Sequence, residues 1–348
     1  MSAARGHNDT LAGTDPRPGH ISIMTSRRRT LQALAALLVP TLARAQPKPA
    51  VAAWPTRPVR LLVGFPGGST PDISARLLAD PLARELGQPV VVENRSGASG
   101  NIAADVVAKA TDDHTLGVLI NGNLTSAPIL NKALPYKPDR DFTPISLLTS
   151  APLVLVAPAD LPGGAAFFQA GRAAGDKWSY GSVGVGSVGH LGMELLFSKT
   201  GLKAVHVPYN GNPQVVTALV NGQVQLALMP PGIAMAHVKA GKLRAIGLSI
   251  PGRSPLVPEV PSLAEAGVVG FDLDVWTALL GPASLSSAAR SRLTTLVPQI
   301  VRGPETRQKL FDAGWQAVGS APEALVSRVR YETATLGSII TMRGITIQ

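Results

Sequence analysis

The sequence predicts an α/β fold with two lobes and a cleft between them. Apolar runs of strand length alternate with longer segments of helical period, which is typical of a parallel sheet covered by helices. Glycine-rich turns follow several of the apolar runs. Two series of these units are joined by long connectors that contain proline, which indicates two lobes.

The strand-like runs follow one another along the chain at 59–63, 89–93, 115–120, 153–157, 178–183, 203–207, 224–229, 243–248 and 271–280. Amphipathic segments separate them and fill the C-terminal part, 287–318 and 322–336. We expect Pro81 to kink or split the first helix, 73–86, and Gly87 to end it.

The first strand and the first helix are joined by a glycine-rich turn, GFPGGSTPD at 64–72. Thr70 is expected as the N-cap, Pro71 as the first helical residue and Asp72 in the first turn. Free N–H groups at a helix N-terminus favour an anion. The residues leave two interpretations open: a grip on a small carboxylate, or an ordinary turn between a strand and a helix.

The N-terminal part has the pattern of an export segment. Residues 24–45 run from three arginines through an apolar stretch, 31–42, to Ala-Arg-Ala, which is typical of a signal peptide. The apolar stretch is shorter than a membrane-spanning helix needs. The arginines also resemble a twin-arginine signal, so the general secretory route and the twin-arginine route both stay open. We expect translation to start at Met24 and residues 1–23 to be an extension.

Composition excludes several classes of function. The chain has no cysteine, which rules out disulfides, cysteine nucleophiles and thiolate metal sites. Aromatic residues make up 4%, which argues against stacking on nucleic acid. Residues 1–45 hold six basic and two acidic residues, so the remaining chain carries a net charge of +6 rather than +10.

Positive charge is concentrated in one stretch. Residues 195–258 contain six lysines and arginines and not one Asp or Glu. Such a stretch attracts anions. The alternative is a basic face that docks on an anionic membrane surface or on an acidic partner.

A second glycine-rich loop matches a nucleotide-binding pattern only in part. Gly184, Gly186 and Gly189 form G-x-G-x-x-G between a predicted strand and a predicted helix. The next strand ends at Pro208 and Tyr209, and no acid follows there for a ribose. We therefore interpret this loop as an anion cradle, and a nucleotide-dependent α/β enzyme stays the alternative.

Catalytic and metal-binding groups are not indicated. Ser187 lacks the context of a nucleophile elbow, because Val185 stands where that motif needs glycine. His190 and Glu194 lie one helical turn apart without the second histidine of a zinc helix. No cofactor or metal is expected, and the prediction is a protein that is not an enzyme.

Many ordered motifs resemble one family, the extracytoplasmic solute receptors of tripartite tricarboxylate transporters, also called the Bug family. They are WP at 54–55, RPVR at 57–60, FPGG at 65–68 with Asp72 and Arg76, VENRSGA at 92–98, DFTP at 141–144, GVGSVGHL at 184–191, VPYNG at 207–211, GKLRA at 241–245, VPSLAEAG at 260–267 and GP at 281–282. Together they cover nearly all of the chain after the export segment.

The resemblance implies a periplasmic-binding-protein fold of type II-like form. Each lobe would be a mostly parallel sheet flanked by helices, with lobe one at 46–151 plus 272–348 and lobe two at 152–271. It also implies capture of a small organic carboxylate in the periplasm by lobe closure, and delivery to a membrane permease. We expect a monomer and no nucleic-acid partner. A ligand sensor that docks on a membrane signalling protein is a further alternative.

The resemblance and the loops together give a set of expected ligand-binding residues. These are Gly68, Ser69, Asp72, Asn121, Asn123, Gly186, Ser187, His190, Tyr209 and Met229. The chain departs from the family pattern at two positions in or beside this set. Met229 stands where many members have Asp, and Asn210, next to Tyr209, replaces a common Lys. Because that Asp is absent, we expect a carboxylate without an amine, with an apolar or aromatic body against Met229.

Overall fold

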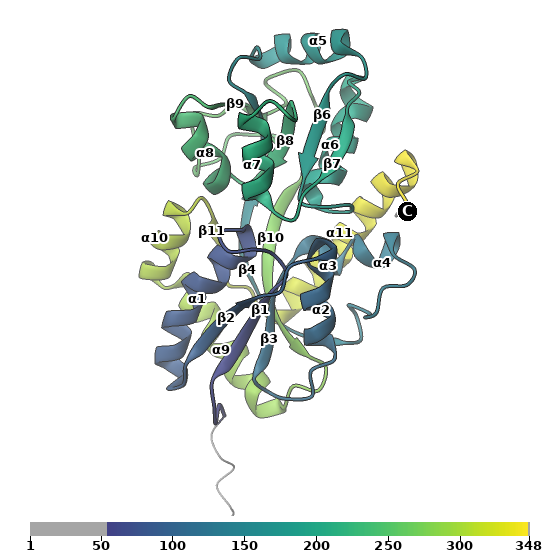
Figure 1. Cartoon of the computed structure of the whole chain (residues 1–348). Coiled ribbons are helices and arrows are strands. Elements are labelled where there is room, and N and C mark those ends of the chain that lie inside the picture. Colours follow the sequence, from purple (N-terminus) through teal and green to yellow (C-terminus); the bar gives the residue numbers. More distant parts are fainter. Residues whose placement is uncertain (1–53, 347–348) are drawn as a thin grey trace, which may run out of the picture. The chain divides into compact units, whose positions relative to one another are not determined.

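A computed structural model describes residues 54–346, which belong to one compact unit. The predicted export segment, 1–45, lies outside the described residues. Two sheets, each flanked by helices, occupy the lower and upper parts of Figure 1. We call the elements around the six-stranded sheet the first lobe and those around the five-stranded sheet the second lobe. Within the described residues, no helix is both long enough and apolar enough to span a membrane.

The sheet of the first lobe has the strand order β11-β4-β10-β3-β1-β2. Its strands are β1 (Val59–Val63), β2 (Val90–Asn94), β3 (Thr115–Ile120), β4 (Phe142–Pro152), β10 (Asp274–Pro282) and β11 (Gln316–Ala317). β1 is parallel to β2 and β3, whereas β10 is antiparallel to β3 and β4, and β11 is antiparallel to β4.

The sheet of the second lobe has the order β7-β6-β8-β5-β9. Its strands are β5 (Val154–Pro158), β6 (Ser179–Ser182), β7 (Val205–Pro208), β8 (Leu226–Met229) and β9 (Leu243–Leu248). β6 is parallel to β7 and β8, and β5 is antiparallel to β8 and β9.

Both sheets are therefore mixed, and the expectation of mostly parallel sheets is corrected. The reason lies in how the chain crosses between the lobes. It leaves the first lobe along β4, enters the second as β5 after the single residue Leu153, and returns as β10. A strand that returns beside the strand that left must run against it, so β10 is antiparallel to β4.

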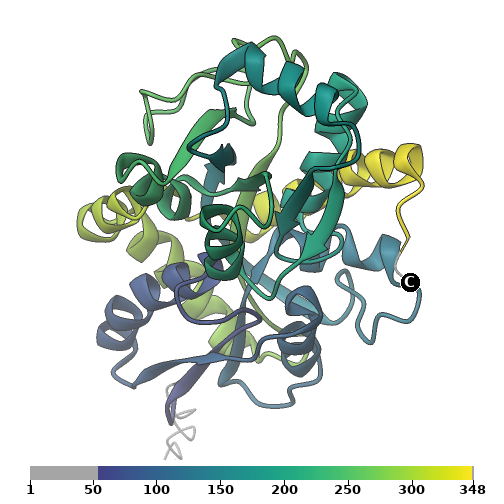
Figure 2. The ribbon, with the colours of Figure 1, turned by 45° about the horizontal axis from the view of Figure 1, so that its top comes forward.

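Helices cover both sheets. The first lobe carries η1 (Ala98–Gly100), α1 (Thr70–Leu86), α2 (Asn101–Ala108), α3 (Asn121–Leu124), α4 (Ala127–Leu130), α9 (Ser287–Arg302), α10 (Pro304–Asp312) and α11 (Pro322–Arg343). The second carries α5 (Gly164–Ala174), α6 (Val188–Thr200), α7 (Asn212–Val220) and α8 (Pro231–Lys239). α11 extends from the first lobe to α6 of the second (Figures 1 and 2).

Local rules account for most helix ends. α1 ends at Gly87 in the left-handed conformation, as predicted, and α6 ends at Gly201 in the same way. Pro81 does not split α1, which continues from Thr70 to Leu86 because its apolar face is buried in the core. The N-cap of α1 is Ser69, one residue before the position predicted.

The strand memberships bear on the predicted domains. Strands of the first sheet come from 59–152 and 274–317, and strands of the second from 154–248. The boundaries 46–151 with 272–348, and 152–271, stay a prediction.

Candidate functional site

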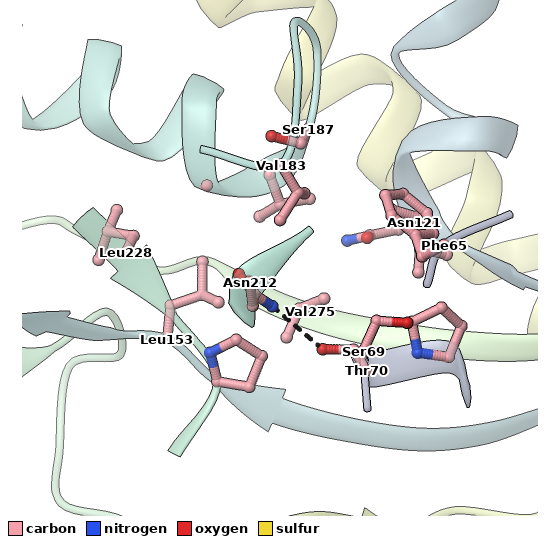
Figure 3. Close-up of a pocket in the computed structure, with 15 residues that line it drawn as sticks. Phe65, Ser69, Thr70, Asn121, Leu153, Val183, Ser187, Asn212, Leu228 and Val275 are labelled. Atoms are coloured by element: carbon pink, nitrogen blue, oxygen red, sulfur yellow. Dashed lines mark hydrogen bonds between the residues drawn. The ribbon is translucent and has the colours of Figure 1, made fainter. Parts of the chain in front are cut away.

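A small buried cavity of about 40 Å³ lies where loops of the two lobes meet (Figure 3). Its lining comes from Phe65, Ser69, Thr70, Pro71, Ile120, Asn121 and Val275 of the first lobe, Leu153 at the crossing, and Val183, Ser187, Val188, Gly189, Asn212, Leu228 and Pro230 of the second lobe. A wider hollow of about 380 Å³ shares Val183 with it. We take the inner cavity as the candidate site, because buried polar atoms without partners within the described chain lie at it.

Four helices begin at this cavity. Ser69, Ser187 and Pro230 are the N-caps of α1, α6 and α8, and Asn212 is the first residue of α7. The N–H groups of a first helical turn have no partner within the helix, and the helix dipole adds partial positive charge there. Among the described residues, the lining includes no Asp, Glu, Lys, Arg or His side chain. The cavity therefore offers positive dipoles, and not ionised side chains, to an anion.

Two buried polar atoms at the cavity lack a hydrogen-bond partner within the described chain. They are Ser69 Oγ and Asn121 Oδ1, in residues that are 2% and 0% exposed. Buried polar atoms are nearly always paired. In Figure 3, both side chains lie at the edge of the same space. These two atoms mark where a ligand would complete the hydrogen bonding.

Asp72 shapes the opening loop and does not line the cavity. Its buried carboxylate accepts hydrogen bonds from the Gly68 N–H (2.9 Å), Arg76 Nε (3.0 Å) and Asn94 Nδ2 (2.9 Å). Burial alone would raise the pKa of Asp72, but these donors outweigh it and hold the pKa below its ordinary value. The buried Asp72 carboxylate, through these hydrogen bonds, thus holds the loop that carries Ser69 in place.

We expect Asp72→Asn to lower the free energy of unfolding by about 2 kcal/mol, since an amide cannot accept from all three donors. Because the folded pKa is lowered, the wild-type contribution is complete above the ordinary value of 3.8 and is lost as pH falls through the folded pKa. Urea unfolding at neutral pH measures the loss. Asp139→Asn, at an exposed loop acid, is the matched control. An equal loss of stability in both variants would refute the stabilising role of the Asp72 hydrogen bonds.

The second loop is held from both lobes. Ser187 Oγ donates to Gly184 O (2.8 Å) and accepts from the His190 N–H (3.3 Å). His190 Nδ1 accepts from the Gly186 N–H (3.1 Å), and burial lowers the pKa of His190 to about 4, so the ring is neutral at neutral pH. Ser126 of the first lobe donates its hydroxyl proton to Gly186 O. His190 therefore holds the loop at 184–187 in place through the Gly186 N–H, without lining the cavity.

The structure brings three of the expected site residues together at the inner cavity: Ser69, Asn121 and Ser187. Gly68 and His190 support the two loops without lining it, and Gly186 lies against Ser126 in a separate small pocket.

Three other expected residues lie elsewhere. Asn123 fixes the loop after β3, with its Nδ2 bonded to Ser99 O and Asn101 Oδ1. Tyr209 lines the wider hollow. Met229 is fully buried in the core of the second lobe and does not line the cavity. None of the six basic residues of 195–258 is part of the lining either.

One supporting residue was missed by sequence reasoning. Glu332 of α11 is 5% exposed and accepts from Asn121 Nδ2 (2.7 Å) on one oxygen and from Trp276 Nε1 on the other. Arg328 Nε lies 3.5 Å from Glu332 Oε2, and a terminal nitrogen of the same guanidinium pairs with Asp274. Burial raises the pKa of Glu332 to about 7, against the effect of these donors. Nothing in the sequence around Glu332 indicates this role, because its partners lie far away along the chain.

Comparison with known proteins identifies the family. Residues 74–345 match the tripartite tricarboxylate transporter family receptor, TctC. A UPF0065 protein from the tcbD–tcbE intergenic region of Pseudomonas sp. strain P51 is 34% identical over 312 residues, covering 88% of this chain and 91% of that protein. A solved Rhodopseudomonas palustris protein with adipate has a TM-score of 0.81 and 31% identity, covering 84% of this chain and 99% of that one. MatC from the same organism, with bound malate, has a TM-score of 0.78 and 32% identity, covering 82% and 100%. The chain therefore belongs to the tripartite tricarboxylate transporter receptors, the family that its sequence motifs resemble.

Proposed function

We propose that this protein is a periplasmic receptor that captures a small organic carboxylate between its lobes and delivers it to membrane permease subunits. The convergence of four helix N-termini on a buried cavity without ionised side chains is the observation that carries the proposal. Receptors of the same family bind adipate and malate. Membership in a family of solute receptors also supports a role other than catalysis.

The ligand would be held by dipoles and hydroxyls. First-turn N–H groups of α1 and α6 and the hydroxyl of Ser69 would donate to carboxylate oxygens, while Phe65, Leu153 and Leu228 exclude water. Hydrogen bonds to an ionised acceptor are the strong ones, and they are stronger where water is excluded. The absence of an acid from the described lining supports the prediction that the carboxylate carries no amine.

Lobe movement would admit and retain the ligand. The lobes touch on several sides of the cavity: Ser99 Oγ donates to Val185 O (3.4 Å), Asn212 Nδ2 to Thr70 Oγ1 (3.5 Å), and Arg343 pairs with Glu194 (2.9 Å). Opening of these contacts would widen the way to the cavity. Closure would then complete the binding site from both lobes in one monomer.

Packing, and not phosphate binding, explains two glycines of the G-x-G-x-x-G loop. A Cβ at Gly189 would lie 3.0 Å from Leu228 O, and one at Gly184 would lie 2.1 Å from Ser99 Oγ. Gly184 also has a φ of +124°, which residues with a side chain rarely adopt, and a Cβ at Gly189 would press on a backbone carbonyl. This weakens the alternative of a nucleotide-dependent enzyme. A ligand sensor would use the same cavity and differ only in its membrane partner.

A ligand screen tests the proposal. We expect carboxylates to stabilise the protein in thermal unfolding, by about 2.7 kcal/mol at 100 times the dissociation constant, and nucleotides to have no effect. Ser69→Ala should weaken the best carboxylate at least about tenfold in isothermal titration calorimetry, because a hydrogen bond to a charged group is lost. Ser338→Ala, at an exposed serine of α11, should bind like the parent. Stabilisation by nucleotides and by no carboxylate would overturn the proposal.

A further inference from the structure

We infer that the ligand of this cavity is a hydroxylated carboxylate whose hydroxyl donates a hydrogen bond to Asn121 Oδ1, and that Glu332 and the Asp274 carbonyl hold the Asn121 amide in the orientation that makes this bond possible. The inference deepens the proposed function and rests on it. It adds a specificity-determining residue, Asn121, and a positioning residue, Glu332.

The orientation of the Asn121 amide is set by two acceptors on one side. Asn121 Nδ2 donates to Glu332 Oε1 (2.7 Å) and to the backbone carbonyl of Asp274 (3.2 Å). If the amide were rotated by half a turn, Asn121 Oδ1 would face both of these oxygens without a proton between them. With Glu332 ionised, the nitrogen must therefore point toward it, and the carbonyl oxygen is the atom left to a ligand.

That carbonyl oxygen has no partner within the described chain, although Asn121 is fully buried. A carbonyl oxygen can only accept, so the missing group is a hydrogen-bond donor. A carboxylate has no proton to give, and thus a second functional group of the ligand must meet Asn121. This separates Asn121 from Ser69, whose hydroxyl can donate to the carboxylate itself.

The donor is a hydroxyl and not an ammonium. Within the described lining there is no Asp or Glu to balance a buried positive charge. The positive ends of four helices also face this space and would repel a cation. A neutral hydroxyl can donate a hydrogen bond to Asn121 Oδ1 without burying a positive charge.

Glu332 can orient the Asn121 amide only as a carboxylate that accepts a hydrogen bond on each of its two oxygens. Its second oxygen accepts from Trp276 Nε1, whose side chain is fully buried on β10. A glutamine at 332 has one accepting oxygen, so Trp276 and Asn121 would compete for it. Glu332→Gln therefore frees the Asn121 amide while changing the volume of the side chain very little.

The test compares carboxylates that differ by one hydroxyl. Isothermal titration calorimetry would be run with succinate against malate, glutarate against 2-hydroxyglutarate, adipate against 3-hydroxyadipate, and 3-phenylpropionate against 3-phenyllactate. For the best-binding pair we expect the hydroxylated member to bind at least about tenfold more tightly to the wild type. Asn121→Ala should reduce that ratio to about threefold or less, and Glu332→Gln should lower it by at least about threefold, mostly by weakening the hydroxylated member. Glu93→Gln, which neutralises another arginine-paired carboxylate away from the cavity, should keep the ratio.

The outcomes separate the two proposals. Equal binding of both members of every pair to the wild type would overturn the inference and leave the receptor function standing, since a water would then satisfy Asn121. A protein that binds no carboxylate would instead refute the proposed function. If Glu332→Gln weakens both members equally, Glu332 is merely structural and its positioning role is refuted. The wild-type comparison decides the hydroxyl preference even if a variant does not fold.

Discussion

Gly232→Ala is expected to lower carboxylate affinity by about 100-fold, while the free energy of unfolding without ligand changes by less than about 1 kcal/mol. Gly232 is the second residue of α8 in the second lobe. A Cβ there would lie 1.8 Å from Ala313 O and 2.9 Å from Ala313 C, in the turn after α10 of the first lobe. A backbone carbonyl cannot move aside as the end of a side chain can. The variant must therefore keep the lobes apart at this point.

The effect should appear in affinity because the cores of the two lobes are untouched. Alanine is a better helix former than glycine, which offsets part of any lost contact. Calorimetry with the best carboxylate of the screen measures the affinity, and small-angle scattering should show a more open particle with saturating ligand. Gly252→Ala is the control, since no described atom lies within 4 Å of a Cβ at that position. Unchanged affinity in Gly232→Ala would show that binding does not need this contact.

The joints between strands and helices could be predicted because they follow from local chemistry. Ser69 and Ser187 lie at the ends of apolar runs, among glycines, directly before helical patterns. Those features determine caps and turns within a few residues, so the positions of both loops could be predicted from the sequence, whereas their binding of an anion stays a prediction. The position of the N-cap at Ser69 differs by one residue from the prediction at Thr70, because both are good caps followed by a proline within two residues.

The position of Met229 could not be obtained in that way. Side chains alternate along β8, so Leu228 lines the cavity and Met229 points into the core opposite Val154. The motif places the strand end at the cleft but does not determine which of two neighbouring residues faces it. An error of one residue moves the side chain to the other face of the sheet.

Contacts between segments that are far apart along the chain could not be predicted from the sequence either. Asn121 and Glu332 are 211 residues apart, and α11 shows only the pattern of an amphipathic helix. The direction of β10 depends on the return of the chain from the second lobe, and an apolar run carries no information on direction. What was missed therefore depends on tertiary contacts that no local pattern encodes.

The pH dependence of stability should change sharply when Glu332 is replaced by glutamine. Glu332 has a folded pKa of about 7 and an ordinary value of 4.5, because desolvation of its buried carboxylate outweighs its donors. Between these values the folded protein binds more protons than the unfolded chain. The free energy of unfolding of the wild type should therefore fall as pH rises from about 4.5 to about 7, by as much as about 3 kcal/mol from this group.

Glutamine resembles the neutral acid in shape and carries no charge at any pH. Relative to the wild type, we therefore expect the stability of Glu332→Gln to rise by up to about 3 kcal/mol between about pH 5 and about pH 8, on top of a loss that does not depend on pH, because the single accepting oxygen cannot serve both Asn121 and Trp276. The neighbouring charged groups are Arg328 on α11 and Asp274 on β10, and the pKa of Asp274 is itself raised, chiefly by burial. Both are present in each protein, so the difference between the two profiles reports on the titration of Glu332.

Urea unfolding of both proteins across this pH range measures the difference. Glu93→Gln serves as the control: the hydrogen bond from Arg60 lowers the pKa of Glu93, so the contribution of that carboxylate is complete above its ordinary value of 4.5, and this variant should be less stable than the wild type by a constant amount across the range. Parallel profiles for Glu332→Gln and the wild type would mean that Glu332 ionises normally in the folded protein. In that case the hydrogen bonds from Asn121 and Trp276 and the charge of Arg328 would balance the cost of burying the Glu332 carboxylate.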